Sequence, residues 1–291
     1  MTKKGKKIWR IVGSILFWGA VVAYLVWAFT LREHTQQGRR IERMEVIVRD
    51  SLESGFISAA TIFNLVDEAG ESPIGKRVDS LDLAKINRLV EEFCFTARAI
   101  TYVDYNNTLT VELTQREPLL RVCTDNGYDF YLTQGLYVLP IEPLASPNLP
   151  VVSGRIDFPF GTTFRGDLRE WLLGEEKKYK DCYNFLCKLI NFVILTETSP
   201  SYEGKIVQIV ATPSKTKAPR GEFDEPHFEL IPRYGDYIVE IGSLEDIKAK
   251  LYRWSRFSEA QVVDMSAGGR LNVEYEGQAL WKAPQTPKKK K

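Results

Sequence analysis

Polar and apolar positions divide the chain into one uninterrupted apolar run near its N-terminus and a long remainder in which apolar residues recur at regular spacings. The run covers residues 11–31 and contains no charged side chain. A helix of this length, at ~1.5 Å of rise per residue, spans the ~30 Å hydrocarbon core of a bilayer. The pattern therefore predicts a single transmembrane helix over residues 11–31.

The charges beside this run indicate its orientation. Positive residues precede it with no acidic residue among them, namely Lys3, Lys4, Lys6, Lys7 and Arg10. Because the positive flank stays in the cytoplasm, residues 1–10 are predicted to form a cytoplasmic tail, and everything after Leu31 lies on the other side. A cleavable signal peptide is the alternative, but its apolar region spans only ~7–15 residues and ends in a small-x-small site, which residues 26–29 lack.

Residues 32–43 are polar and charged, and are predicted to form a short stalk before a small domain at residues 44–114. In that domain the apolar period changes from two to helical spacing and back. The pattern predicts a strand over 44–49, a helix capped by Ser58, a helix over 83–93, and a hairpin of strands 99–103 and 109–113. The predicted order is strand-helix-helix-strand-strand.

A larger, β-rich domain is predicted over residues 115–282, followed by a disordered tail at 283–291. The expected elements are a hairpin over 128–138, an extended proline-rich stretch over 140–150, a helix over 166–196 with a break at Gly174, strands over 206–210, 228–230 and 237–241, a mobile hairpin tip over 212–226, a helix that starts at Ser243 and Asp246, and a final strand pair, 261–265 and 271–275. The predicted fold class is α+β.

Composition narrows the classes of function. The formal net charge is only +1 at pH 7, which does not indicate a nucleic-acid partner. Four cysteines without CxxC spacing and two distant histidines do not match a zinc site, and neither a metal, a cofactor nor a small-molecule substrate is predicted. Cys182 and Cys187 are expected to be free thiols, whereas a Cys94–Cys123 bridge stays open for a domain outside the cytoplasm.

An enzyme is the competing class. Ser214 and Lys217 match the Ser-x-x-Lys motif of penicillin-binding proteins, but the chain lacks the companion motifs and the match falls in a predicted loop. His227 has no serine or cysteine near it in the sequence that it could activate as a base. We therefore expect no catalytic residues, and a membrane-anchored cell-wall enzyme with an unrecognised active site remains the alternative.

Several short motifs occur in a characteristic order, namely Phe56-Ile57-Ser58, Ile74-Gly75-Lys76, Leu81-Asp82-Leu83, Arg116-Glu117-Pro118, Tyr131-Leu132 with Gly135, Val138 and Pro140, Leu149-Pro150-Val151-Val152-Ser153-Gly154, and Val263-Asp264-Met265 before Trp281. In this order the chain resembles the bacterial cell-division family FtsQ, called DivIB in Gram-positive bacteria, over nearly its whole length. The segment 212–226 and the lysine tail depart from the family pattern. The resemblance implies that residues 44–114 form a POTRA-like domain.

The resemblance also implies a function and a location. It implies a scaffold of the divisome without catalytic activity, held in the inner membrane at the division septum as a single-pass type II protein with its bulk in the periplasm. The implied partners are FtsL-like and FtsB-like coiled-coil membrane proteins, together with other divisome proteins such as FtsK and FtsW. The complex would regulate septal peptidoglycan synthesis.

In that family the last strands of the β domain bind the coiled-coil partners. An unpaired terminal strand exposes backbone N–H and C=O groups, and a second chain can pair with them. The predicted partner-binding residues are Val262, Val263, Met265, Leu271, Val273, Tyr275 and Trp281, with Tyr252 and Trp254 as a possible floor. For Trp254 ordinary core packing is favoured, and for Val263 and Val273 interior packing is the alternative.

Overall fold

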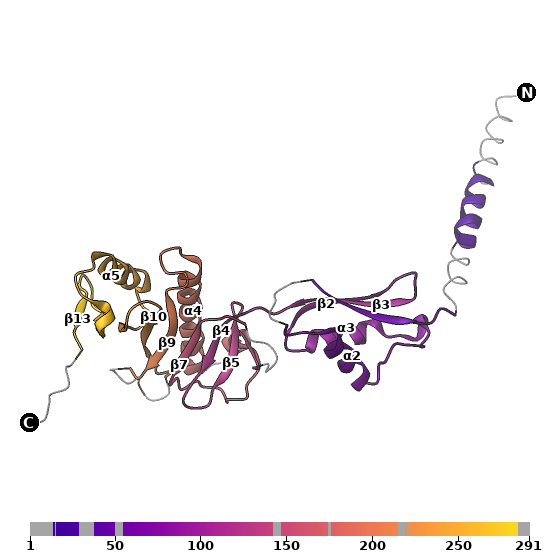
Figure 1. The fold of residues 1–291 in the computed structure, drawn as a ribbon. Helices are drawn as coiled ribbons and strands as arrows, with labels where there is room; N and C mark the ends of the chain where they lie inside the picture. The colour runs from indigo at the N-terminus through magenta and orange to yellow at the C-terminus, as the bar shows by residue number, and fades with distance from the viewer. Residues whose placement is uncertain are drawn as a thin grey trace, which may run out of the picture. The chain divides into compact units, whose positions relative to one another are not determined.

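The computed structural model describes residues 14, 16–28, 38–49, 55–141, 147–173, 176–214, 219 and 222–284. The chain divides into two compact units, which Figure 1 shows in ribbon form. The first unit comprises Met1–Ser51 and Ile57–Gln115, and the second comprises Leu52–Phe56 and Arg116–Lys291. Both units combine helices and strands, and the second is richer in strands, so the predicted α+β class is confirmed.

Part of the predicted transmembrane segment is described. Residues 16–28 are helical, and most of their large apolar side chains are exposed, among them Phe17, Trp18 and Leu25. Residues 11–13, 15 and 29–31 of the predicted span lie outside the described residues. Within the residues that the structure describes, no helix has both the length and the hydropathy needed to cross a bilayer.

The described part of the first unit contains a three-stranded sheet covered by helices on one face (Figure 1). The strand order is β1 (Arg43–Val48), β3 (Thr108–Gln115), β2 (Thr96–Val103), with β1 parallel to β3 and β2 antiparallel to it. The helices are α2 (Ala59–Glu68) and α3 (Leu83–Glu92), with the short 3-10 helix η1 (Val78–Ser80) between them. The predicted order of elements is confirmed.

A small core holds this unit together. The register of β1 and β3 pairs Met44 with Leu109 and Val46 with Val111, so alternate residues of both strands face the helices. The helices bury Ile62, Val66, Ile86 and Val90 against this face. Ser58 caps α2, as predicted, because its side chain accepts the backbone N–H of Thr61 at 3.1 Å.

The described part of the second unit contains a ten-stranded sheet with the order β13-β12-β11-β10-β9-β7-β4-β5-β6-β8. Neighbouring strands are antiparallel except for the parallel pairs β4 with β7, β7 with β9, and β11 with β12. The strands are β4 (Pro118–Cys123), β5 (Asp129–Thr133), β6 (Tyr137–Leu139), β7 (Val151–Gly154), β8 (Gly166–Asp167), β9 (Ile206–Thr212), β10 (His227–Pro232), β11 (Tyr237–Gly242), β12 (Gly269–Asn272) and β13 (Leu280–Lys282).

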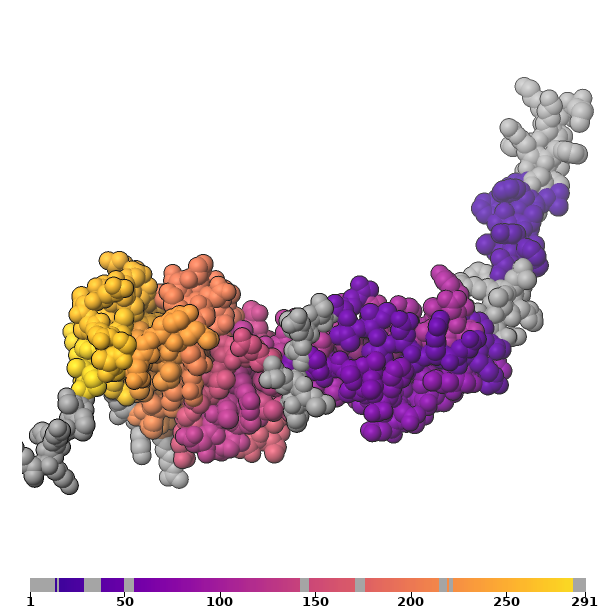
Figure 2. Space-filling model, in the orientation of Figure 1, coloured from indigo at the N-terminus to yellow at the C-terminus, as the bar shows by residue number. Residues whose placement is uncertain are grey.

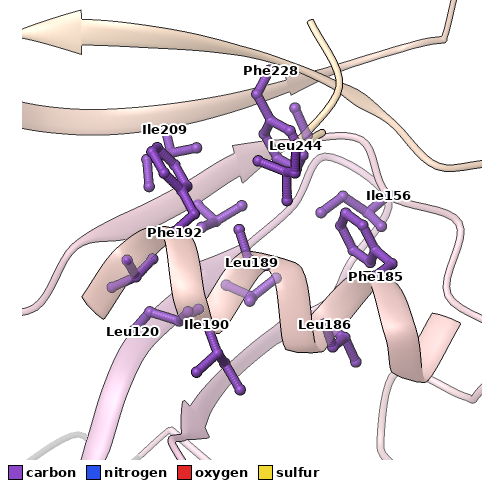
Figure 3. Close-up of a cluster of buried hydrophobic side chains, with 14 of the residues drawn as sticks. Leu120, Ile156, Phe185, Leu186, Leu189, Ile190, Phe192, Ile209, Phe228 and Leu244 are labelled. Atoms are coloured by element: carbon purple, nitrogen blue, oxygen red, sulfur yellow. The ribbon is translucent and has the colours of Figure 1, made fainter. Parts of the chain in front are cut away.

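The core of this unit lies between the sheet and its long helix, α4 (Lys177–Thr198). Figure 3 shows Phe185, Leu189 and Phe192 of α4 close to side chains of the strands, including Ile209 and Phe228. Burial of each such side chain stabilises the fold by about 1.5–3 kcal/mol. A second helix, α5 (Ile247–Ala260), contributes Leu251 and Trp254 to the same core.

Three local predictions are wrong. The predicted helix over 166–196 begins only at Lys177, because β8 and the 3-10 helix η2 (Leu168–Leu173) precede it. Residues 261–265 do not form a strand; Gln261 adopts a left-handed conformation, and Asp264 caps the 3-10 helix η3 (Met265–Ala267) by accepting the N–H of Ser266 at 3.0 Å. Local side-chain capping overrides the apolar alternation there.

The third correction is smaller. Ser243 does not cap α5, because Asp246 is the N-cap residue and the Ser243 carbonyl instead accepts the Lys250 ammonium at 2.8 Å. In the segment 212–226, predicted to be a mobile tip, Phe223 is buried and its ring lies 5.2 Å from that of Phe185. Residues 215–218, 220 and 221 of that segment lie outside the described residues.

Candidate protein-interaction edge

The last two strands form one end of the large sheet. β12 runs parallel to β11 because α5 carries the chain back between them, and β13 then returns antiparallel to β12. The register places Trp281 opposite Leu271, with Leu280 opposite Asn272. Among the described residues no strand pairs with the outer side of β13, so this strand is an edge.

Aromatic packing holds β13 in place. The ring of Trp281 stacks at 5.8 Å on Phe257 of α5 and lies 6.0 Å from Tyr237 of β11. Beneath the indole lies Gly269, whose φ of +149° is a conformation that other residues rarely adopt. A Cβ atom at this position would stand 2.7 Å from Cη2 of Trp281, so only glycine leaves room for the indole. Gly269 is therefore needed for the position of β13.

A polar network covers the other face of these strands. Arg270 donates to the carboxylates of Glu229 on β10 and Glu240 on β11, and Asn272 donates to Glu240 at 2.8 Å. The hydrogen bond to Glu240 raises the pKa of Arg270, which keeps its charge in any case. Lys282 stands opposite Arg270 in the register, so the edge presents a positive side chain next to this network.

The predicted partner-binding residues fall into two groups. Leu271 and Val273 are fully buried in the core, where interior packing was the alternative for Val273. Val262 and Tyr275 are exposed, whereas Val263, Met265 and Trp281 are half-buried. The structure therefore brings Trp281 and Leu271 together at the β12–β13 pair, while Val262 and Val263 lie in the connection after α5.

The sequence reasoning missed residues that belong to this edge. Leu280, 48 % exposed, and Lys282 flank Trp281 on β13 and point to the opposite side of the strand. The signal was the alternation Leu280-Trp281-Lys282, which is too short to stand out from a turn. Gly269 was also missed, although Gly268-Gly269 before an apolar strand indicates a close approach of another group.

A pocket opens near the same edge. Its cavity of about 270 Å³ is lined by residues of α5, of η3 and of the turns before β9 and β11, including Tyr202, Tyr237, Trp254 and Met265. The indole N–H of Trp254 donates to the Tyr237 hydroxyl at 2.9 Å, and the rings of Trp254 and Tyr202 stack at 6.3 Å. The predicted core packing of Trp254 is confirmed, whereas Tyr252 is exposed.

The groups considered for catalysis lie elsewhere. His227 begins β10, with Nδ1 3.9 Å from a carboxylate oxygen of Glu274, which is an ion-pair distance only if the imidazole is protonated. Ser214 follows β9, and Lys215–Lys217 lie outside the described residues.

Cys182 is fully buried, and burial raises the pKa of its thiol, as expected for an inert structural cysteine. Cys123 is an exposed free thiol, so the Cys94–Cys123 bridge is not formed.

Comparison with known families gives the two units separate matches. A POTRA-like domain matches residues 39–114, and the family described as FtsQ/DivIB, C-terminal related, matches residues 117–280. No curated protein matches the chain. Residues 117–280 make up more than half of the 291-residue chain and contain α5, β12 and the first residue of β13, Leu280. The chain therefore belongs to the FtsQ/DivIB family.

Proposed function

We propose that this protein is a membrane-anchored scaffold of the bacterial divisome that binds FtsL-like and FtsB-like coiled-coil proteins through its C-terminal edge strand. FtsQ/DivIB proteins are non-enzymatic scaffolds of cell division. The observation that carries the proposal is the free outer side of β13 among the described residues, in a sheet that the family match covers as far as Leu280. Residues 11–31 provide the anchor, so both units lie in the periplasm at the septum.

Strand addition explains how a short edge could bind a partner. The partner would pair its backbone with β13, and its side chains would meet Leu280 and Lys282 on one side of the strand and the rim around Trp281 on the other. Lys282 favours an acidic residue on the facing strand. The nearby aromatic pocket could take an apolar side chain of the same partner, because interfaces draw most of their free energy from a few anchors in pockets.

The binding residues we propose follow from exposure. Leu280, Tyr275 and Lys282 are exposed and contact the partner directly, as does Val262, with Val263 and Met265 at the margin. Trp281 both contacts the partner and holds β13 against Phe257. Leu271 and Val273 act indirectly, through the core beneath the edge. FtsK, FtsW and the septal synthases would join through the complex.

The proposed binding edge can be tested with one substitution on β13 and a matched control substitution elsewhere on the sheet. Leu280→Glu places a charge on the outer edge, and we expect co-purification of the coiled-coil partner from membranes to fall by about 30-fold, the size of a 2 kcal/mol hot spot. Val207→Glu on β9 changes a residue of equal exposure, 48 %, away from the edge and should leave co-purification unchanged. Circular dichroism establishes that both variants are folded.

Two further changes extend the test. Tyr275→Glu should also abolish co-purification with the fold intact, whereas Trp281→Glu should abolish it and also loosen β13, because the ring packs on Phe257.

Depletion of the protein should give filamentous cells. Folded Leu280→Glu and Tyr275→Glu variants that still recover the partner would exclude the edge as the binding site, and normal division on depletion would favour the alternative of a cell-wall enzyme.

A further inference from the structure

At one end of the first unit, two loops are hydrogen-bonded to residues 39–42, which lead into β1. The backbone of Ile41 accepts the N–H of Gly75 at 2.8 Å and donates to the carbonyl of Lys76 at 3.0 Å. Glu42 donates to the carbonyl of Asn107 at 3.0 Å. The loop of residues 73–77 and the β2–β3 turn of residues 104–107 are therefore both fixed to the start of β1.

Arginine side chains tighten the same arrangement. Arg39 donates through Nε to the side-chain oxygen of Asn107 at 2.7 Å, and also to the carbonyl of Asp104. Arg40 donates to the carbonyl of Gly75 at 2.7 Å. The tips of both loops are thus held by hydrogen bonds from residues 39–42, and their outward orientation is built into the unit.

Each of these loops presents an apolar or aromatic side chain at its tip. Ile74 is 61 % exposed although its neighbour Pro73 is buried, and Tyr105 is 92 % exposed, the largest exposure among the described large hydrophobic residues. An exposed isoleucine and tyrosine contribute nothing to the core of this unit. Tyrosine and apolar residues next to basic ones are typical of segments that lie at a membrane–water interface.

The charges at this end favour an anionic surface only moderately. Arg39 and Arg40 donate to neutral oxygens, and neither guanidinium forms an ion pair within the part of the chain that the structure describes. Arg77, in contrast, is paired with Asp79 at 2.5 Å. Because Asp104 and Glu42 also lie at this end, apolar contact should contribute more than lipid charge.

The covalent connection determines how far this end can be from a bilayer. The predicted transmembrane helix ends at Leu31, and the eight peptide steps from there to Arg39 reach at most about 28 Å even when fully extended. The residues that hold both loops therefore follow the predicted span after only a short length of chain. A short tether of this kind gives the loops a high effective concentration at the membrane surface.

We infer that the loops 73–77 and 104–107 form a membrane-contact surface, in which Ile74 and Tyr105 insert among the lipid headgroups while Arg39 and Arg40 face lipid phosphates. The ligand is the phospholipid bilayer itself, on its periplasmic side. This inference rests on the anchoring by residues 11–31 in the proposed function. It assigns the first unit a fixed orientation toward the membrane.

The test places a benzophenone amino acid in the full-length chain, reconstituted in vesicles of phosphatidylcholine with or without phosphatidylglycerol. We expect lipid adducts, measured by mass spectrometry after illumination, to be about tenfold more frequent at positions 74 and 105 than at positions 47 and 100. Ile47 and Ile100 are matched controls, since both are exposed apolar residues on strands of the same unit. Phosphatidylglycerol should raise the yield by only about twofold.

The possible outcomes distinguish the membrane-contact surface from the transmembrane anchor on which it depends and from a protein-binding site. Retention of the chain in alkaline carbonate with equal adduct yields at all four positions would overturn the membrane-contact surface alone. Extraction of the chain by carbonate would overturn the anchor, and this inference with it. Arg39→Glu with Arg40→Glu should lower the adduct yield at position 105 without changing recovery of the coiled-coil partner. If partner recovery fell and the yield stayed the same, the surface would instead be a protein-binding site.

Discussion

The two edge strands of the large sheet, β8 and β13, differ in length and in the side chains that they expose. β8 at one end has only two residues, and the chain then turns at once into η2, whose first residue Leu168 is fully buried. β13 at the other end carries exposed Leu280 and is followed by Ala283 and Pro284, which are also exposed. The chain thus leaves the sheet directly after a very short strand at one end, whereas at the other end the edge strand carries an exposed apolar side chain.

Charge reinforces this difference. At the β8 end, the carboxylate of Asp167 accepts two N–H groups of the Arg169 guanidinium and the backbone N–H of Arg169 at 2.9 Å, so its hydrogen-bonding capacity is used locally. Very short edges with inward-directed charges are the usual protection against unwanted strand pairing. The β13 end is short too, but an aromatic side chain holds it and an exposed leucine extends from it. Figure 2 shows its residues, in yellow, on the surface beside α5. The comparison separates a protected edge from one suited to recognition.

The largest effect that tests this comparison concerns the core beneath the free edge. Leu271→Ala should lower the free energy of unfolding of the second unit by about 3 kcal/mol, as expected when a fully buried leucine is truncated. Leu280→Ala on the neighbouring strand should change it by less than about 0.5 kcal/mol, because the side chain is half exposed. Urea unfolding of both variants gives the values. Equal losses would mean that Leu280 belongs to the core and not to a binding edge.

A second prediction compares a glycine at each end. Gly269 and Gly166 have φ of +149° and +138°, so Gly→Ala strains the backbone at both, by about 1–2 kcal/mol. At Gly166 the added Cβ meets only Phe164 at 3.7 Å, an ordinary contact, whereas at Gly269 it overlaps Trp281. We expect Gly269→Ala to add about 1–3 kcal/mol of overpacking.

The consequence for binding distinguishes the two variants more clearly than stability does. Gly269→Ala should displace β13 and reduce partner recovery, with a shift in tryptophan fluorescence as Trp281 leaves Phe257. Gly166→Ala should retain full recovery, since β8 takes no part in the proposed interface. Loss of recovery in both variants would indicate general unfolding, and retention in both would argue against the role of Gly269.

The sequence predicted elements where the pattern and local chemistry agree. Met44, Val46 and Val48 alternate because one face of β1 is buried against helices, and Ser58 marks the start of α2 by its own hydrogen bond. The pattern failed at residues 261–265, where the Asp264 carboxylate caps a 3-10 helix that apolar alternation cannot reveal. Such local bonds compete with the strand pattern and are visible only in three dimensions.

The candidate edge was predicted in outline only. Trp281 was selected correctly as part of the last strand pair, but Leu280, Lys282 and Gly269 were not, because their roles depend on the pairing of β13 with β12. A three-residue strand has too few positions to show a period, and the pairing partner lies across a turn. The roles of Leu280, Lys282 and Gly269 could not be predicted because they depend on the register between strands that are distant in the sequence.

The smallest predicted effect is a pH dependence at the protected end. Hydrogen bonds from the Arg169 guanidinium hold the pKa of Asp167 below its usual value of about 3.9. A lowered pKa in the folded state means that the carboxylate stabilises the fold above the unfolded value of about 3.9, and that this contribution is lost as the pH falls through the lower folded value.

Arg169→Ala removes the cause of this shift, so its unfolding free energy should fall below that of the unmodified chain at neutral pH and approach it under strongly acidic conditions. Urea unfolding at several pH values measures the difference, which should be small because the guanidinium is largely exposed. A difference that stays constant with pH would mean that Arg169 acts by packing and not by charge. Partner recovery at neutral pH should be unchanged, because the proposed interface lies at β13, and a loss there would show that the two ends of the sheet are not independent.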